Sequence, residues 1–253
     1  MKGALFLPVY EKGFLNDNQE LLPALLERRH GARLALAVCT NWRRAAIAVL
    51  LQSGRANQFH RRLQRSGSAF LHFIRGTPPS STRLTDSAPF LDAIAAGDFA
   101  TADDIARHSN HRWIEDEEYE EDFRFYEFLM THALPGAPAD PANAILDRWD
   151  ACLAGTDDQR LPVCHAMVGK DAAAFDAALI DYLDAREKDQ REQLPMMEPE
   201  AAATEASVSI EGLALRQLAA RRGLATAAEH PQIPVPLVPQ SVDWPFESFR
   251  SID

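Results

Sequence analysis

The sequence predicts an all-α fold. Segments rich in Ala and Leu carry apolar residues three and four positions apart, which places those residues on one face of a helix. Glycine and proline interrupt this pattern at intervals that suit helix–turn–helix units, and no segment sustains the period-two alternation that is typical of strands. These observations favour antiparallel helical hairpins stacked into an α-solenoid or TPR-like bundle, with an extended proline-rich C-terminal tail.

The first third of the chain is predicted to be a basic helical layer. The predicted helices span residues 20–29, 32–52 and 56–75. The Gly-Thr-Pro-Pro-Ser-Ser segment at 76–81 then breaks the pattern, so we assign residues 1–76 to this layer.

Residues 84–253 are predicted to be a body of helical hairpins that ends in the tail. The predicted helices span residues 87–96, 101–108, 115–133, 141–154, 158–168, 171–192 and 207–221. Pro195 and Pro199 predict a flexible link at 194–206. Five prolines after His230 (Pro231, Pro234, Pro236, Pro239 and Pro245) predict that the tail is extended. We expect layer and body to pack as one compact unit.

The two parts differ in charge. Residues 1–83 contain 13 Lys and Arg against 4 Asp and Glu, whereas residues 84–253 contain 13 against 33. One interpretation is that the basic layer docks on the acidic body. The other is that the body meets a basic partner, because a surface of one sign speeds association with the opposite sign. Both interpretations are compatible with the net charge of −11.

Composition also bounds the cellular setting. A chain of 253 residues is long enough to bury a substantial core. We find no uncharged apolar run near the length of about 18 residues that a membrane span needs, and the short apolar start lacks a small-residue cleavage site. The three cysteines are an odd number without a Cys-x-x-Cys pair, which suits reduced thiols. We therefore expect a cytoplasmic protein that does not bind membranes.

The segment from Glu115 to Asp122 is the strongest local signal, with seven carboxylates in eight residues followed directly by large apolar and aromatic side chains. We expect the acidic end of a helix anchored in the core. The predicted partner-binding residues are Glu115, Asp116, Glu117, Glu120 and Glu121. The alternative for these five is a solvated face.

Glu118 and Asp122 lie on a helical stripe beside the predicted core, so we expect structural ion pairing for both. Arginines of the N-terminal layer are candidate partners. They are Arg43, Arg44, Arg61 and Arg62.

No segment carries a recognisable catalytic, metal-binding or phosphate-binding motif. The chain has no Gly-x-Ser-x-Gly turn and no glycine-rich phosphate loop, and Asp104 and His108 alone make a weak metal pair. The basic stretch at 55–65 could contact nucleic acid, but the acidic remainder would repel phosphates. We therefore expect neither an enzyme nor a nucleic-acid-binding protein, and no metal or cofactor.

Four segments resemble a known family. Residues 97–107 (Gly-Asp-Phe-Ala-Thr-Ala-Asp-Asp-Ile-Ala-Arg), 118–123, 171–179 and 211–219 are similar to Imm49-type immunity proteins of bacterial polymorphic toxin systems. The resemblance covers roughly residues 84–240. It implies a non-enzymatic cytoplasmic protein that binds a cognate toxin domain and blocks it.

The resulting hypothesis is an all-α immunity protein whose acidic surface occludes the active site of a basic toxin, such as a nuclease. The alternative is a helical-repeat scaffold that binds a peptide or a regulatory partner in a groove. A hydrophobic or basic groove would favour that scaffold. An enzyme with a carboxylate-bound metal is a third possibility.

Overall fold

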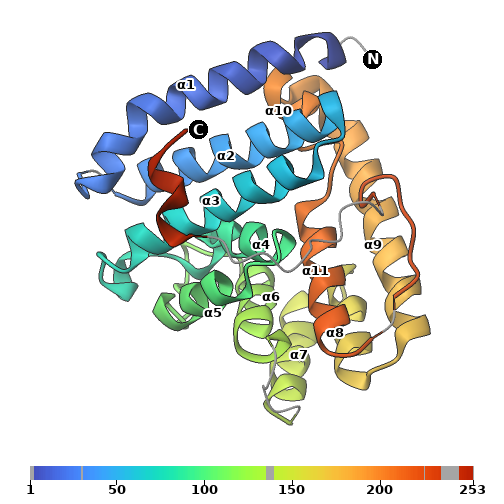
Figure 1. Ribbon diagram of the computed structural model, residues 1–253. Coiled ribbons are helices and arrows are strands. Elements are labelled where there is room, and N and C mark those ends of the chain that lie inside the picture. The colour runs from blue at the N-terminus through green and yellow to red at the C-terminus, as the bar shows by residue number, and fades with distance from the viewer. Residues whose placement is uncertain (1–2, 30, 135–139, 225, 235–244, 253) are drawn as a thin grey trace.

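The computed structural model describes residues 3–29, 31–134, 140–224, 226–234 and 245–252 (Figure 1). The prediction of an all-α fold is confirmed, because these residues form helices and a single isolated bridge between His230 and Ile233. The α-helices are α1 (Leu7–Leu26), α2 (Ala32–Ser53), α3 (Ala56–Ile74), α4 (Ala88–Ala95), α5 (Phe99–His108), α6 (Glu120–Phe128), α7 (Asp140–Leu153), α8 (Arg160–Gly169), α9 (Ala172–Gln193), α10 (Pro199–Ala203) and α11 (Ile210–Arg221). The shorter helical turns are η1 (Gly3–Phe6), η2 (Pro79–Ser81), η3 (Leu84–Asp86), the π-turn η4 (Leu129–Ala133), η5 (Leu194–Met196) and η7 (Phe246–Arg250).

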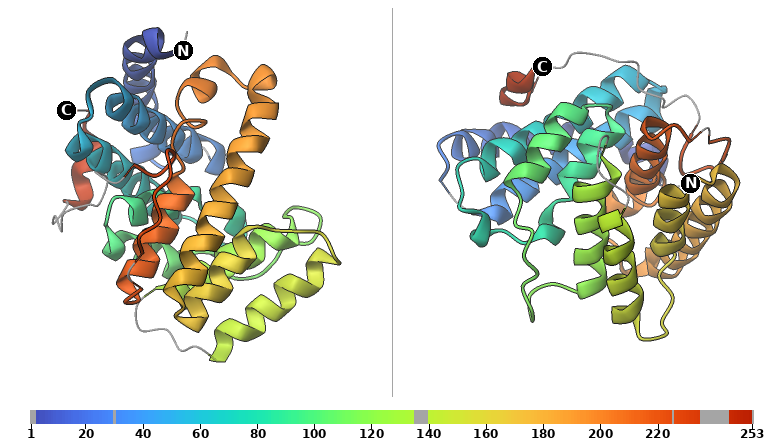
Figure 2. Two further views of the ribbon diagram at one scale, coloured as in Figure 1. Left: turned by 90° about the vertical axis from the view of Figure 1, so that its right-hand side faces the viewer. Right: turned by 90° about the horizontal axis from the view of Figure 1, so that it is seen from below.

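Helices that follow one another in the chain mostly pack against one another. Helix α2 lies between α1 and α3, and α4 and α5 pack beneath α3. Helices α6 to α9 continue the series along the lower and right-hand side of Figure 1. Two later elements cross back, since α11 packs on α4 and η7 packs on α3. Figure 2 shows α11 beside α9 as well, so α11 lies between α4 in the middle of the series and α9 at its end.

The two predicted glycine turns share one construction. Gly97 has a left-handed φ of 79°. The carboxylate of Asp98 then accepts a hydrogen bond from the backbone N–H of Thr101 at the start of α5. In the second turn Lys170 takes the left-handed conformation, and Asp171 caps α9. A left-handed residue ends one helix and an aspartate starts the next, which makes a tight helical hairpin.

Three boundaries differ from the predicted ones. Helix α1 begins at Leu7 and runs through Pro23, because Leu7, Phe14 and Leu22 form a buried stripe that spans the whole segment. The predicted link at 194–206 contains η5 and α10. The last part of the predicted tail forms η7, where Phe249 is fully buried against α3, and Pro236 and Pro239 lie outside the described residues.

Helix α2 is apolar and long enough to cross a membrane, with a mean hydropathy of 1.4. Length and composition alone are weak evidence for a membrane-spanning helix, because the core helices of soluble proteins can be equally long and apolar. Half of the most apolar stretch of α2 is buried inside the molecule, where Ala35, Val38 and Trp42 contact the rest of the core. The apolar residues of α2 therefore have partners within this chain.

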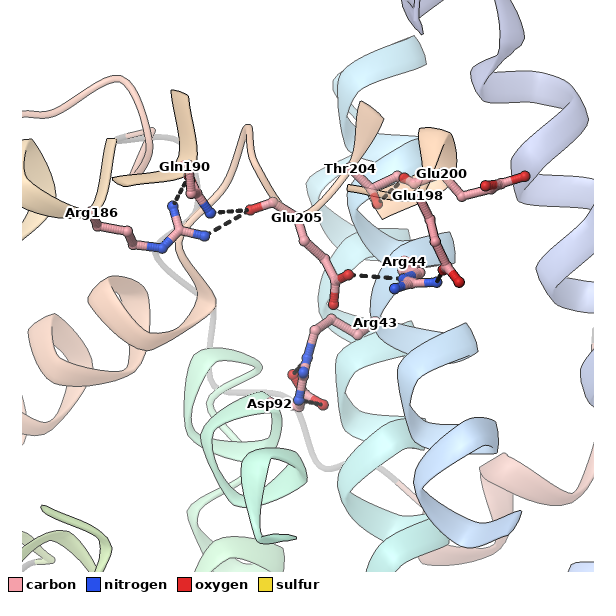
Figure 3. A network of polar contacts seen from close by, with 9 residues as sticks. All are labelled: Arg43, Arg44, Asp92, Arg186, Gln190, Glu198, Glu200, Thr204 and Glu205. Atoms are coloured by element: carbon pink, nitrogen blue, oxygen red, sulfur yellow. Dashed lines mark hydrogen bonds and ion pairs between the residues drawn. The ribbon is translucent and has the colours of Figure 1, made fainter. Parts of the chain in front are cut away.

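A buried ion pair joins α2 to α4. The Arg43 guanidinium donates from Nε to Oδ1 of Asp92 at 2.6 Å and from Nη2 to Oδ2 at 2.9 Å (Figure 3). The Ser66 hydroxyl also donates to Oδ2 of Asp92. The Asp92 side chain is 0% exposed. Burial raises the pKa of Asp92, and the Arg43 cation opposes that rise. For Arg43, burial is outweighed by Asp92, which raises the pKa of the guanidinium. The Arg43 guanidinium and the Ser66 hydroxyl therefore offset part of the cost of burying the Asp92 carboxylate.

Glu205 connects the N-terminal helices to α9. Its carboxylate accepts from Nε of Arg44 at 2.8 Å, and its backbone carbonyl accepts from Nη2 of Arg186 at 2.7 Å and from Gln190 at 3.2 Å (Figure 3). Glu198 adds a second carboxylate beside Arg44. Cations of the basic layer thus contact carboxylates of the acidic body inside one chain.

We expect Asp92→Ala to lower the free energy of unfolding by about 3–5 kcal/mol, because Arg43 would remain charged and unpaired in the core. Urea unfolding measures this loss. The exposed pair of Asp103 and Arg107 provides the matched control, since Asp103→Ala should cost about 0.5 kcal/mol or less. The double variant Arg43→Met/Asp92→Leu should recover most of the stability. Equal losses for Asp92→Ala and Asp103→Ala would contradict this role.

Candidate functional site

The acidic segment is a turn followed by a helix. Residues 115–119 precede α6, which begins only at Glu120, so the helix predicted over 115–133 is too long at its start. The backbone N–H groups of Glu117 and Glu118 both donate to the carbonyl of Ile114, and Asp116 has a left-handed φ of 68°. Aspartate tolerates this conformation better than most residues, which explains why the helix does not extend further back.

Glu118 fastens this turn to the body. One of its carboxylate oxygens accepts from the backbone N–H and the hydroxyl of Thr85, at 3.0 and 3.1 Å, and the other accepts from the N–H of Ile114 at 3.1 Å. Its backbone carbonyl accepts from the indole N–H of Trp113. The side chain is largely buried, in line with so many donors around it. The partners of Glu118 are therefore hydrogen-bond donors on η3 and on the turn itself.

The rest of the turn faces solvent. Glu115, Asp116 and Glu117 are exposed, and no described residue forms a hydrogen bond or an ion pair with their carboxylates. Tyr119 is 76% exposed, an unusual position for a large aromatic ring. We call residues 115–119 the acidic turn. It offers three carboxylates without partners and one aromatic side chain on a fixed backbone.

The carboxylates in the first turn of α6 have different surroundings. Glu120 pairs with Arg124 at 2.6 Å, one helical turn later. Asp122 accepts from Arg160 at 2.8 Å. No described residue pairs with Glu121. All three lie at the N-terminal end of α6, where the helix dipole favours negative charge, so they also stabilise the first turn of this helix.

Three of the four arginines that were candidate partners of Glu118 and Asp122 contact other carboxylates. Arg43 and Arg44 pair with Asp92 and Glu205, and Arg62 pairs with Glu11 on α1 at 2.7 Å.

A cleft of about 510 Å³ opens beside α6. One wall is a face of α9, the second is the turn before α8, and Glu121 and Glu211 approach from α6 and α11. A smaller cavity of about 190 Å³ shares Tyr182, Arg186 and Glu211 with it and reaches Arg43 and Glu205. The residues that line the large cleft are Glu121, Leu153, Thr156, Asp157, Asp158, Gln159, Arg160, Tyr182, Ala185, Arg186, Asp189, Gln190, Gln193 and Glu211.

The two arginines of the cleft are held by internal partners. Arg160 donates to Asp158 and Asp122, and its guanidinium lies 4.9 Å from the centre of the Phe125 ring. Burial alone would lower the pKa of Arg160, but Asp158 and Glu211 outweigh burial and raise it. Arg186 donates to neutral acceptors on Gln190, Gln232 and Glu205, and burial lowers its pKa.

Glu211 and Tyr182 form the polar floor that the cleft shares with the smaller cavity. Burial raises the pKa of Glu211, while Arg160 and a hydrogen bond with Tyr182 oppose the rise. Burial, with the nearby Glu211 carboxylate, also raises the pKa of the Tyr182 phenol well above its usual range. The floor is therefore a hydrogen-bonded pair of half-buried groups.

Comparison with known proteins now decides the family. The sequence model of Immunity protein 49 (Imm49) matches residues 29–241. This chain belongs to the Imm49 family. It is thus an immunity protein of a toxin system, and proteins of this kind are typically non-catalytic. No curated protein and no solved structure matches the chain.

The Imm49 match extends further than the resemblance found by reading the sequence, which covered roughly residues 84–240. It includes α2 and α3, the acidic turn and every residue of the cleft. Helix α1 and the terminal turn η7 lie outside it.

One group of side chains has the composition of a metal site. Asp184, Glu187 and His230 place ligand atoms within 4.8 Å of one another. The backbone N–H of Gln232 donates to Nδ1 of His230, so a neutral ring carries its proton on Nε2, which faces Asp184 at 3.3 Å. A metal ion at Nε2 would need that proton removed. The arrangement instead suits a hydrogen bond that holds the segment around His230 on α9.

Sequence reasoning missed the cleft, although α9 carried a signal for it. Tyr182, Arg186, Asp189 and Gln193 recur three or four residues apart and so form a polar stripe along the helix. The same helix also carries an apolar pattern with Phe175, Leu179 and Leu183, which predicts a core-facing helix. A polar stripe in a sequence does not distinguish a solvated face from the wall of a cleft.

We expect Glu118→Gln to loosen the acidic turn, because its amide NH2 group would face the N–H donor of either Thr85 or Ile114. The loss should be about 1–3 kcal/mol of unfolding free energy. Amide hydrogen exchange should also become faster at residues 113–119 than in the rest of the chain. Glu117→Gln, on an exposed neighbour, is the control and should change neither quantity. Unchanged exchange in Glu118→Gln would rule out the fastening role.

Proposed function

We propose that this Imm49 protein binds a cognate basic toxin through the acidic turn and Glu121 and prevents substrate from reaching the toxin active site. Inhibition is steric and electrostatic, and the immunity protein performs no chemistry of its own. The proposed place of action is the cytoplasm, where an incoming toxin would meet its target. A nuclease is the favoured class of toxin, since its substrate is a polyanion.

The observation that carries this proposal is the state of the exposed carboxylates. The carboxylates of Glu115, Asp116 and Glu117 form no hydrogen bond or ion pair with a described residue, while Glu118 fixes the backbone that bears them. Carboxylates that only stabilised the fold would be expected to form ion pairs, as Glu120 does, whereas Arg83 donates only to the backbone carbonyl of Glu117. A rigid turn loses little conformational entropy on binding, so its charges are available to a partner at low cost.

Electrostatics favour a cationic partner. The chain has a net charge of −11, and Arg43, Arg44 and Arg62 of the N-terminal helices are paired internally. A negative surface attracts a basic protein over a distance and raises the association rate. A nuclease binds phosphates with Lys and Arg, and a row of carboxylates presents similar charges at its active site.

The exposed Tyr119 ring adds an apolar surface to the acidic turn, which can pack against a partner. Aromatic residues at the centre of an interface often carry much of the binding energy, because they bury a large area with few rotatable bonds. Tyr119 stands between the exposed carboxylates and the start of α6.

The scaffold alternative has less support. A hydrophobic or basic groove would favour a peptide-binding scaffold, whereas five carboxylates and two arginines line the large cleft. Both arginines already have internal partners, so the cleft does not present free positive charge.

Charge reversal tests the electrostatic part of the proposal. Glu115→Lys/Glu117→Lys leaves the left-handed Asp116 in place and should lower the association rate with the toxin by about tenfold or more at low salt. The salt dependence of that rate should also weaken. The toxin to use is the product of the adjacent upstream gene, and surface plasmon resonance measures the rates.

The matched control is Asp17→Lys/Glu20→Lys, which makes the same change in net charge on exposed positions of α1. Its effect should be much smaller. Co-expression adds a functional readout, because the unmodified protein should restore growth of cells that make the toxin. Equal slowing by both variants would show that only net charge matters, and the turn would lose its assigned role.

Tyr119→Ala tests the aromatic contact separately. We expect the dissociation rate to rise by about tenfold or more while the association rate stays nearly constant, since packing acts after the encounter. Kinetics with the same immobilised toxin separate the two rates. A dissociation rate equal to that of the unmodified protein would place Tyr119 outside the interface.

A further inference from the structure

The cleft between α6, α8, α9 and α11 has the shape and charge of a pocket for a side chain. We propose that it receives a basic side chain of the bound partner, with the guanidinium of an arginine as the preferred group. This inference rests on the proposed function, because it identifies a second point of contact with the toxin. It concerns residues outside the acidic turn, and Glu121 of α6 is the one residue that the cleft shares with the surface assigned to the toxin above.

The size of the cleft suits such a guest. A volume of about 510 Å³ falls within the range of about 300–1,000 Å³ that is usual for ligand pockets. One wall is a helix face, since α9 contributes the side that runs from Tyr182 to Gln193, and the other is the turn before α8, in which Asp158 pairs with Arg160. The cleft is therefore a preformed recess, and a flexible side chain can enter it without opening the fold.

The free charges of the cleft are negative. No described residue forms a hydrogen bond or an ion pair with the carboxylates of Glu121, Asp157 or Asp189. Asp157 and Asp189 are exposed, whereas Arg160 and Arg186 are half-buried. The accessible carboxylates thus stand at the opening of the cleft and the cations lie deeper. An incoming group meets negative charge first.

Neither internal cation is free to neutralise these carboxylates. Arg160 is held by Asp158 and Asp122, and it also packs on aromatic rings of the core. Arg186 is held by Gln232 and by the Glu205 carbonyl, which in turn belongs to the network with Arg44 (Figure 3). Moving either arginine would break contacts between helices. The negative charge at the opening is consequently left for an external partner.

Arginine suits this site better than lysine. Its planar guanidinium has five N–H donors in a fixed fork and can bind more than one carboxylate at once, whereas an ammonium is a compact and strongly hydrated charge. The side-chain carbonyls of Gln190 and Gln193 add neutral acceptors at the cleft wall.

The direct test uses L-argininamide as the probe and its uncharged isostere L-citrullinamide as the control ligand. We expect argininamide to shift the backbone amide NMR signals of the cleft, at residues 156–160 and 185–193, in a saturable manner. Citrullinamide at the same concentrations should leave those signals in place. Absence of saturable shifts at the cleft with argininamide would overturn the inference.

Two variants tie the probe to the carboxylates. Asp157→Asn/Asp189→Asn removes charge at the opening while leaving the acidic turn intact, and it should weaken argininamide binding by about tenfold. Asp17→Asn/Glu20→Gln removes as much charge from exposed positions of α1 and should leave binding unchanged. Equal affinity in both variants would show that the probe binds the protein only through its general negative charge, which would also overturn the inference.

Binding to the toxin separates this inference from the proposed function. If both hold, Asp157→Asn/Asp189→Asn should raise the dissociation rate of the toxin complex by about tenfold. Normal toxin kinetics in this variant would remove the cleft from the interface while the role of the acidic turn stands. If the unmodified protein binds argininamide at the cleft but does not bind the toxin, the guanidinium site stands and the proposed function is wrong.

Discussion

The ion pair of Arg43 and Asp92 is the constraint on which the rest of the structure depends. A fully buried carboxylate is stable only where a cation and further donors surround it, so α2, α3 and α4 must meet in the one arrangement that brings Arg43 and Ser66 to Asp92. Helix α11 packs on α4, and Glu205 links the neighbouring Arg44 to α9. The positions of α9 and α11, and with them the cleft, follow from that first contact.

The same network explains how one chain can be both basic and acidic. Arginines of α2 and α3 are used inside the molecule, against Asp92, Glu205 and Glu11. Each of these pairs uses one cation and one carboxylate, so the net charge of −11 is carried by the carboxylates in excess. Those of the acidic turn and of the opening of the cleft are among the carboxylates that form no ion pair with a described residue.

The helices were predictable because apolar periodicity is local information. Contacts between distant segments were not predictable. Arg43 and Asp92, for example, are 49 residues apart, and neither segment carries a pattern that indicates the other as its partner. The acidic run failed as a helix prediction for a related reason. A left-handed Asp116 and a carboxylate that binds Thr85 decide where α6 begins, and Thr85 belongs to a different segment. Helical periodicity did separate Glu118, on the stripe beside the predicted core, from Glu117. It could not identify the donors that hold Glu118, because Thr85 belongs to another segment.

Two adjacent arginines in the middle of α2 also affect how the chain is made. A newly synthesised segment with the hydropathy of α2 resembles the segments that a translocation channel releases sideways into the lipid bilayer. An arginine at the centre of such a segment costs about 2.5–3.5 kcal/mol on insertion scales, and α2 carries Arg43 and Arg44 together. The side chains that later order the folded core thus also oppose misdirection of the nascent chain before its partners have been synthesised.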